Sequence, residues 1–397
     1  MTSIYNYERR LRWAYDLLKR ADMAEDDREN IGLFVNHLKA RGVSDGRLAK
    51  YIYHLKVCAT MAHLTGADRQ GIERLVKELR MRGYTAKTFL DFTSAIKRFT
   101  KFVKYGNVDV DTPFPDEVRW LKESIKANEM TQPEFLTPHE VETMIAATPQ
   151  VRNKAMLAVG FEAGLRASEL LNMNIGDVSF DTRGARIKVR GKTGERVVRL
   201  ISSAPALTRW LEERSGGSDP SDPLWTSAAT NSAGGRLAWA SWNRIIKKIG
   251  KAASIKKRVH NHMLRHGSAT EAAKYLTEEE LKVRYGWTGG SDMPSVYVHL
   301  NSADLDDKLA WLYSGKEVKP PEPEFRPTLC PKCREVNSPG QRFCGRCGTP
   351  LDPKELAKSS VEIEELKMEM KDVKELVKTL LSQASQERTK ASQGLSS

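Results

Sequence analysis

Apolar residues in the first third of the chain recur at helical spacing. They come every three or four positions at 31–38, 48–55, 72–79 and 89–99, with polar residues between them. This period places the apolar side chains of each stretch on one face of an α-helix. The pattern predicts a helical domain over residues 1–128.

The middle of the chain combines helical and strand patterns. A capping box at 137–140 opens one predicted helix, and an apolar stretch at 153–162 predicts another. Apolar and polar residues alternate at 186–190, and a partner run follows at 197–200, so we expect a pair of antiparallel strands. The predicted fold class is therefore mainly α with a small antiparallel β-sheet (α+β), with a second domain over residues 134–315.

The last part of the chain changes composition several times. Residues 316–328 are rich in proline and glutamate and predict an extended linker. Within 355–382 an apolar seam repeats at intervals of three and four, at Ile363, Leu366, Met370, Val373, Val377 and Leu380. This seam predicts an amphipathic helix that forms a short coiled coil for self-association or packs on its own chain. Residues 383–397 are polar and predict a disordered tail.

Four of the five cysteines form two Cys-x-x-Cys pairs within residues 329–351. They are Cys330, Cys333, Cys344 and Cys347. Four thiolates at this spacing suit one tetrahedral ion, so we expect a zinc ribbon held by a structural zinc. The sequence leaves open whether this ribbon contacts DNA or another protein. The remaining cysteine, Cys58, lies in a helical stretch and is expected to be a small buried hydrophobe.

Charge narrows the choice of partner. The 397 residues carry a net charge of +13, which is typical of proteins that bind a polyanion and favours nucleic acid. No apolar run approaches the roughly 20 residues of a membrane span. The N-terminus lacks the apolar core of a signal peptide, so we expect a cytoplasmic protein with no membrane partner.

Candidate chemistry begins with His262 and Arg265, which lie three apart in the stretch His-Met-Leu-Arg-His-Gly. On a helix they point the same way, so the arginine can clamp a phosphate while the histidine handles a proton. Such a pair by itself is more often an ordinary surface or core pair. Four further motifs accompany it, namely Gly164-Leu165-Arg166-Ala167-Ser168-Glu169, Gly191-Lys192-Thr193-Gly194, Gly286-Trp287 and Tyr297-Val298-His299.

In this order the motifs resemble those of the tyrosine recombinase (phage integrase, Xer) family, and the zinc ribbon suggests an archaeal-type member. The resemblance covers roughly residues 30 to 313. It implies a helical core-binding domain at 1–128, which binds DNA, and a catalytic domain at 134–315. The zinc ribbon and the C-terminal helix are additions to that plan.

The resemblance also implies a role for each motif residue. Tyr297 would be the nucleophile that attacks a DNA phosphorus and forms a 3′-phosphotyrosyl bond. The residues that would bind the phosphate oxygens are Arg166, His262, Arg265 and Trp287. Lys192 would protonate the leaving 5′ oxygen, His262 would assist proton transfer from the tyrosine, and Glu169 would orient Arg166. Neither ATP nor a catalytic metal is implied.

Two basic clusters are candidates for contact with the DNA backbone. The first lies on the polar side of the helix predicted at 89–99 and contains Lys87, Lys97, Arg98 and Lys101. The second precedes the His262 motif and contains Lys256, Lys257 and Arg258. A solvated helix face is the alternative explanation for either cluster.

The sequence therefore predicts a site-specific recombinase or integrase of the cytoplasm, associated with the nucleoid. Its partners would be double-stranded DNA with specific recombination sites and further copies of itself, as a tetramer in the synaptic complex. A type IB topoisomerase-like relaxing enzyme and a non-catalytic DNA-binding protein are the alternatives. Whether Tyr297 acts in its own site or in that of a neighbour is left open, because its spacing from Trp287 is one residue longer than in the common bacterial form.

Overall fold

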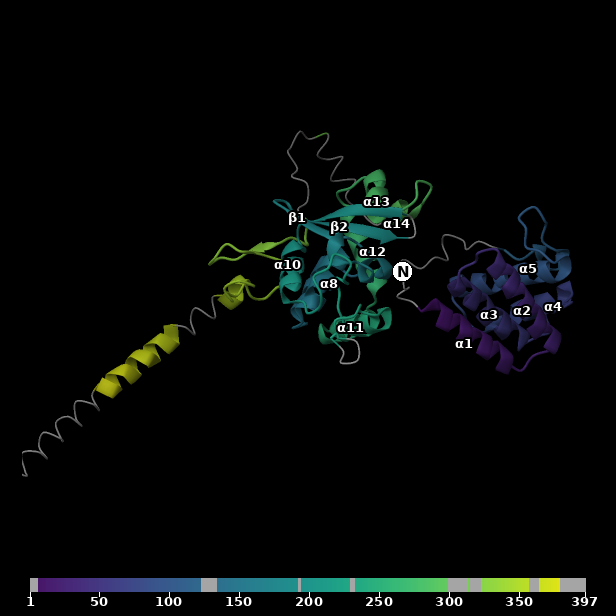
Figure 1. Ribbon diagram of the computed structural model, residues 1–397, viewed down its shortest axis with the longest axis horizontal. Coiled ribbons are helices and arrows are strands. Elements are labelled where there is room, and N and C mark those ends of the chain that lie inside the picture. The colour runs from purple at the N-terminus through teal and green to yellow at the C-terminus, as the bar shows by residue number, and fades with distance from the viewer. Residues whose placement is uncertain are drawn as a thin grey trace, which may run out of the picture. The chain divides into compact units, whose positions relative to one another are not determined.

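The computed structural model describes residues 6–122, 134–191, 194–228, 233–298, 313, 323–356 and 364–378. The chain divides into two compact units, Met1–Pro133 and Glu134–Ser397 (Figure 1). Several predicted features lie outside the described residues, namely Lys192, the polar linker before Glu134, most of 316–328 and the tail 383–397. Among the described residues, no helix combines the length and the apolar character that crossing a membrane requires.

The first unit is a bundle of helices. Its elements are α1 (Tyr7–Arg20), α2 (Glu25–Ala40), α3 (Asp45–Ala59), α4 (Arg69–Met81), α5 (Ala86–Tyr105) and the short α6 (Asp116–Arg119). At the centre of its core, the Phe34 ring meets the rings of Tyr51 and Phe99 edge-on, at 5.5 and 5.8 Å between centroids. The apolar stripes read from the sequence supply this core. Cys58 is fully buried, and burial raises the pKa of its thiol to about 12, as expected for a small hydrophobe.

Two lysines of the first basic cluster do not lie where the sequence placed them. Lys97 and Lys101 are buried, so the prediction that they form an exposed DNA-contacting face is wrong. The Lys97 ammonium donates to the carbonyl of Leu121 at 3.1 Å, and Lys101 donates to the carbonyls of Asp109 and Thr112. Long lysine stems can cross an apolar surface and carry the charge to backbone acceptors, here those of the segment that follows α5. Lys87 remains exposed and Arg98 is half-buried.

The second unit surrounds one buried helix with helices and a small sheet. The helices are α7 (Pro138–Ala146), α8 (Val151–Glu162), α9 (Ala167–Leu171), α10 (Ala204–Glu213), α11 (Trp239–Ala252), α12 (Asn261–Ala272), α13 (Glu278–Tyr285) and α14 (Met293–Val298). The central helix α8 is buried along most of its length and packs on α7, α10 and α12. Such a helix needs apolar residues all round, which explains why its sequence lacks a polar face.

Strands β1 (Val178–Asp181), β2 (Gly184–Gly191) and β3 (Gly194–Leu200) form the antiparallel sheet in the order β1-β2-β3. Ile187 pairs with Val198, and Gly191 pairs with Gly194 at the end of the β2–β3 hairpin. Ile187 and Val198 are buried, as the alternation of the sequence requires. These features confirm the predicted fold class of mainly α with a small antiparallel sheet.

The cysteine-rich segment folds around a second, two-stranded sheet of β4 (Thr328–Leu329) and β5 (Val336–Asn337). It packs on the same unit through α10, because the Ala206 amide donates to the Ser338 hydroxyl at 2.9 Å. The Ser202 hydroxyl donates to the carbonyl of Phe325 at 2.9 Å, just before β4. Residues 364–378 form a further helix.

Candidate active site

One buried carboxylate lies at the centre of the site. Glu169, near the start of α9, accepts a hydrogen bond from the Arg166 guanidinium at 2.6 Å. Arg196 of β3 donates to both of its oxygens, at 3.2 and 2.9 Å, and Arg265 of α12 lies 3.8 Å away. Three arginines from three separate elements therefore converge on Glu169, which fixes their positions relative to one another.

Backbone geometry brings Arg166 and Arg265 together. Gly164 ends α8 with a φ of +58°, and an added Cβ there would lie 2.1 Å from the Tyr285 ring. Only glycine fits this turn, which directs the chain into Arg166 and α9. The Arg265 guanidinium donates to the carbonyls of Gly164 and Tyr285, each at 2.7 Å. The buried arginine thus has acceptors on both sides.

The β2–β3 hairpin approaches the same carboxylate. A Cβ at Gly191 would lie 2.6 Å from Glu169 Oε1, so the end of β2 can come this close only with glycine in place. Lys192 follows Gly191 directly, but its own position lies outside the described residues. The base of the β2–β3 hairpin therefore lies next to Glu169 and the arginines that surround it.

The proposed nucleophile lies in the same site of the same chain. Tyr297 of α14 is only 1% exposed, and its hydroxyl shares a hydrogen bond of 2.5 Å with His266 Nδ1. The His266 ring lies 4.5 Å from the His262 ring, centroid to centroid, one turn earlier on α12. His262 is exposed, so a phosphate in solution can reach it.

Trp287 lies between two tyrosines. Its ring stacks on Tyr297 at 5.6 Å with an interplanar angle of 4°, and on Tyr285 at 5.1 Å. The Arg265 guanidinium lies 5.6 Å from the Trp287 ring centroid. Trp287 is therefore both a packing residue and a wall of the site, and its indole can offer only an N–H.

The electrostatics of the site favour an anion. Burial by itself would raise the pKa of Glu169, but hydrogen bonds and charge from Arg196 and Arg166 lower it to about 2. Desolvation, with the charge of Arg166, lowers the pKa of Arg265 to about 10, so it stays protonated near neutral pH. Three guanidinium groups around one carboxylate leave a local excess of positive charge, which a DNA phosphate can neutralise.

Both histidines are neutral near pH 7. Desolvation, followed by the positive charges of its neighbours, lowers the pKa of His262 to about 4. Desolvation also lowers the pKa of His266, with further contributions from His260 and Arg265. A neutral imidazole can accept a proton, and His266 Nδ1 already faces the hydroxyl of Tyr297. The pKa of Tyr297 is raised to about 12 by burial, so the phenol needs such an acceptor before it can attack.

The residues of the second basic cluster differ in their contacts. Lys257 pairs with Glu140 of the α7 capping box at 2.7 Å and also donates to the carbonyl of Phe135. Its charge therefore stabilises the start of α7. Lys256 and Arg258 are exposed on either side of it.

Sequence reasoning assigned no role to Arg196 or His266. Arg196 lies on a strand, and nothing in the spacing of the motifs relates it to Glu169. His266 could have been found, because it lies four residues after His262 and thus on the same face of α12.

The four predicted metal ligands converge. Cys330 and Cys347 have their sulfurs 3.6 Å apart, as do Cys333 and Cys344, and all four lie within 4.8 Å of one another. A tetrahedral zinc with Zn–S bonds of about 2.3 Å spaces its sulfurs by about 3.8 Å. The donor set therefore fits one zinc ion.

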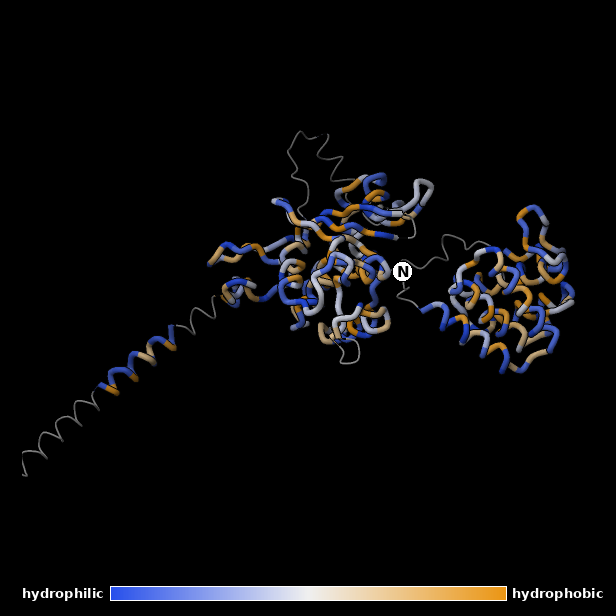
Figure 2. Tube along the Cα trace, in the orientation of Figure 1, coloured by the Kyte–Doolittle hydropathy of each residue, from blue (hydrophilic) through white to orange (hydrophobic). Residues whose placement is uncertain are grey.

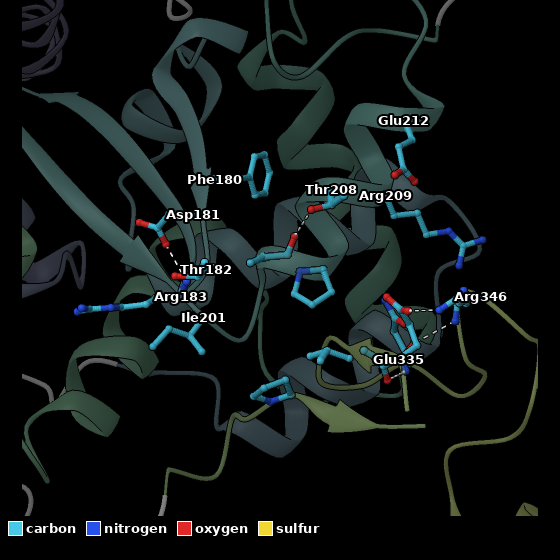
Figure 3. Close-up of a pocket in the computed structure, with 18 of the residues that line it drawn as sticks. Phe180, Asp181, Thr182, Arg183, Ile201, Thr208, Arg209, Glu212, Glu335 and Arg346 are labelled. Atoms are coloured by element: carbon cyan, nitrogen blue, oxygen red, sulfur yellow. Dashed lines mark hydrogen bonds and ion pairs between the residues drawn. The ribbon is translucent and has the colours of Figure 1, made fainter. Parts of the chain in front are cut away.

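A cavity of about 910 Å³ lies where the cysteine-rich segment meets β1 and α10 (Figure 3). Asp181 and Arg209 line it from one side, and Glu335 and Arg346, an ion pair at 3.5 Å, line it from the other. Its charges are of both signs. It contains none of the residues around Glu169, so it is separate from the candidate active site.

Two parts of the chain match known protein families. Residues 134–304 match the model of the phage integrase family, and residues 329–351 match that of the zinc-ribbon domain. A tyrosine recombinase of Pseudothermotoga lettingae is 27% identical over 289 residues, which cover 70% of this chain and 94% of the relative. XerD of Pseudomonas aeruginosa is 28% identical over 286 residues, which cover 67% of this chain and 91% of XerD.

Solved structures share the fold. The recombinase XerH, bound to a palindromic difH substrate after cleavage, aligns with a TM-score of 0.55 and 17% identity over 78% of this chain and 96% of its own. The lambda integrase tetramer bound to a Holliday junction aligns with a TM-score of 0.54 and 16% identity over 68% of this chain and 76% of its own. The protein is thus an enzyme of the class that breaks and rejoins DNA strands. Residues 134–304 of the chain match the phage integrase (tyrosine recombinase) family, and residues 329–351 match the zinc-ribbon domain.

Proposed function

We propose that this protein is a site-specific recombinase that cuts and rejoins DNA through a 3′-phosphotyrosyl intermediate. The observation that carries this proposal is the convergence of three arginines on Glu169 beside a buried tyrosine of the same chain. A phosphodiester with two charged clamps and an adjacent nucleophile can undergo in-line displacement without ATP or a catalytic metal.

In the proposed reaction the Tyr297 oxygen forms a bond to phosphorus while the bond from phosphorus to the 5′ oxygen breaks. Arg166 and Arg265 bind the non-bridging oxygens, whose negative charge grows in the transition state. Trp287 offers its N–H to the same oxygens. Lys192 gives a proton to the departing 5′ oxygen, so that charge and protons balance. Rejoining is the reverse sequence with a new 5′ hydroxyl as the nucleophile.

The proton of Tyr297 goes to His266 in this account. His266 lies within hydrogen-bond distance of the phenol, at 2.5 Å, and its lowered pKa keeps it neutral and able to accept. His262 is the more exposed of the two histidines, so we assign it to a phosphate oxygen and leave the proton of Tyr297 on His266. This assignment differs from the expectation that His262 assists proton transfer from the tyrosine. It also makes Tyr297 act in its own site.

The substrate we propose is double-stranded DNA with specific recombination sites. XerH was solved on its difH site and lambda integrase as a tetramer on a Holliday junction, and we extend such an assembly to this chain. Residues 1–128 would bind DNA as the core-binding domain, with Lys87 and Arg98 as candidate contacts, and Lys256 and Arg258 would contact the backbone beside the active site. We further propose a structural zinc in the ribbon and a location in the cytoplasm with the nucleoid. The archaeal-type character stays a prediction.

A plasmid assay tests the proposal. Plasmids with two copies of a candidate site should yield recombinant circles with the wild-type protein, and plasmids with one copy should yield none. Relaxation of supercoiled plasmid without any site would instead favour a type IB topoisomerase-like enzyme. Binding to the sites with no strand exchange and no cleavage would favour a non-catalytic DNA-binding protein. The Tyr297→Phe variant is the control for protein-independent breakage.

A further inference from the structure

The helix at 364–378 exposes an apolar stripe. Leu366, Met370, Val373 and Val377 are 58%, 60%, 59% and 48% exposed. Figure 2 shows hydrophobic segments recurring along this helix between hydrophilic ones. An isolated helix of this length is only marginally stable in water, and the stripe would be costly to hydrate. The stripe therefore requires a partner surface.

The residue types in the stripe favour one kind of partner. With Ile363 as the first position of a heptad, the a positions are Ile363, Met370 and Val377, and the d positions are Leu366, Val373 and Leu380. Ile363 and Leu380 lie outside the described residues and are assigned from the sequence alone. Two of the three a positions are β-branched and two of the three d positions are leucine, a combination that favours two parallel strands. The seam thus suits a second copy of itself.

The flanking charges favour the same arrangement. Glu362 and Glu369 occupy g positions, and Lys367 and Lys374 occupy e positions. In a parallel, in-register pair each g residue meets the e residue five positions later on the other helix, so Glu369 meets Lys374 of the partner subunit. In an antiparallel pair g faces g and e faces e, which would bring glutamate against glutamate and lysine against lysine. Charge therefore selects the parallel pair.

We propose that the helix of residues 364–378 pairs with the same helix of a second copy of this chain as a parallel, in-register, two-stranded coiled coil. The helix is described over 15 residues, so the coil is weak alone and holds two protomers where they are already close. Such a tether raises the effective concentration of the second protomer once the first has bound. This inference goes beyond the proposed function, and its test needs neither DNA nor catalysis.

Disulfide cross-linking of the full-length protein tests the register. Leu366→Cys places a thiol at a d position, where the two copies meet in a parallel pair, and Met368→Cys places one at position f, on the outer side of the helix. Mild oxidation should give a covalent dimer with Leu366→Cys and only the wild-type background with Met368→Cys. In an antiparallel pair Leu366 would face the other end of the partner helix and would not cross-link. Equal yields at both positions, or no dimer at either, would overturn the proposal.

Charge exchange tests the pairing independently of helix formation. In the Glu369→Lys variant, the introduced lysine of each helix would face Lys374 of the other helix, at both symmetric contacts. The yield of the Leu366→Cys dimer should therefore fall about tenfold. Adding Lys374→Glu restores the opposite pairing with the signs reversed, and the yield should recover. A single exchange that leaves the yield unchanged, or a double exchange that fails to restore it, would contradict the parallel coil.

Discussion

At the residue scale, the carboxylate of Glu169 holds the active site together. It is fully buried, and its charge is compensated by Arg166, which precedes α9, Arg196 of β3 and Arg265 of α12. A buried ion pair loses far more when one partner is removed than it contributes as a whole, because the remaining charges are left without compensation. Glu169 is accordingly a positioning residue, and its loss should show in stability as well as in activity.

Glu169→Gln removes that charge and keeps the size of the side chain. The three guanidinium groups would then repel one another in a buried place, so the free energy of unfolding should fall by about 3 kcal/mol. Urea denaturation followed by tryptophan fluorescence measures this. Glu195→Gln is the matched control, since Glu195 pairs with Lys188 and Arg190 at the surface, and its loss should cost much less stability than that of Glu169. Equal effects of the two changes would contradict the role of Glu169.

The same residue predicts a pH dependence. The pKa of Glu169 falls from 4.5 to about 2 on folding, so its contribution is complete above pH 4.5 and is lost as the pH falls towards 2. The stability difference between wild type and Glu169→Gln should therefore be constant from pH 7 to 5 and shrink below it. A difference that stays constant down to pH 3 would show that folding does not lower the pKa of Glu169.

His266→Ala tests the proton acceptor. The change should slow single-turnover cleavage by about 10²-fold, with unchanged affinity for DNA, because the phenol loses its base. The wild-type rate should rise with pH through a pKa below the usual 6.5 of histidine, and the variant should lack this limb. His266→Ala with full activity and the wild-type pH profile would return the role to His262.

Which residues the sequence could predict depends on where their partners lie. Arg166 and Glu169 are three apart on one helix start, so their contact follows from spacing. Arg196 contacts Glu169 only because the sheet packs beside α9, and no local sequence pattern predicts that packing. The error at Lys97 and Lys101 has a related cause, because helical period separates polar from apolar positions but does not show that a following segment covers the polar side.

At the element scale, the β2–β3 hairpin connects the sheet to the phosphate site. Its pairing ends at Gly191 and Gly194, and the close approach of Gly191 to Glu169 anchors its base beside the arginines. Alternating residues predicted the two strands and their turn. The anchoring could not be predicted, because it depends on the absence of a Cβ opposite a carboxylate from another element.

Lys192→Ala tests what the hairpin delivers. Cleavage of ordinary DNA should fall by about 10² to 10³-fold, because the 5′ oxygen then leaves without a proton. DNA with sulfur in place of that bridging oxygen should be cleaved by the variant at close to the wild-type rate, since a thiolate leaves unprotonated. The defect is measured in a single-turnover assay with both substrates. Failure of the sulfur substrate to rescue Lys192→Ala would assign the lysine to binding or positioning.

At the scale of the whole molecule, the zinc ribbon is packed against the catalytic unit. Ser338 and Phe325 accept hydrogen bonds from Ala206 and Ser202 at the start of α10, and α10 in turn packs on the central helix α8. The cysteine spacing predicted the ribbon but not this contact. Ribbon and catalytic unit should therefore unfold as coupled parts.

Zinc removal tests the coupling. A strong chelator should unfold the ribbon and lower the melting temperature of the catalytic unit, because the contacts with α10 are lost. Ser338→Ala, which removes one acceptor and leaves the zinc ligands intact, should cost about 1–2 kcal/mol in the presence of zinc. Differential scanning calorimetry with and without chelator measures both. A catalytic transition that does not move on chelation would show that the ribbon is an independent module.

The proposed reaction depends on Tyr297 as the nucleophile, and covalent trapping tests that role most directly. Wild-type protein and the Tyr297→Phe variant are incubated with nicked duplexes drawn from the replicon that carries the gene, and the products are separated on a denaturing gel. The nick makes the fragment with the new 5′ hydroxyl so short that it diffuses away. Rejoining then fails, and the phosphotyrosyl intermediate accumulates. We expect a protein–DNA adduct with wild type, linked through Tyr297 by peptide mass analysis, and none with Tyr297→Phe, although both bind the duplex. An adduct that persists in Tyr297→Phe, or that maps to another residue, would contradict the account.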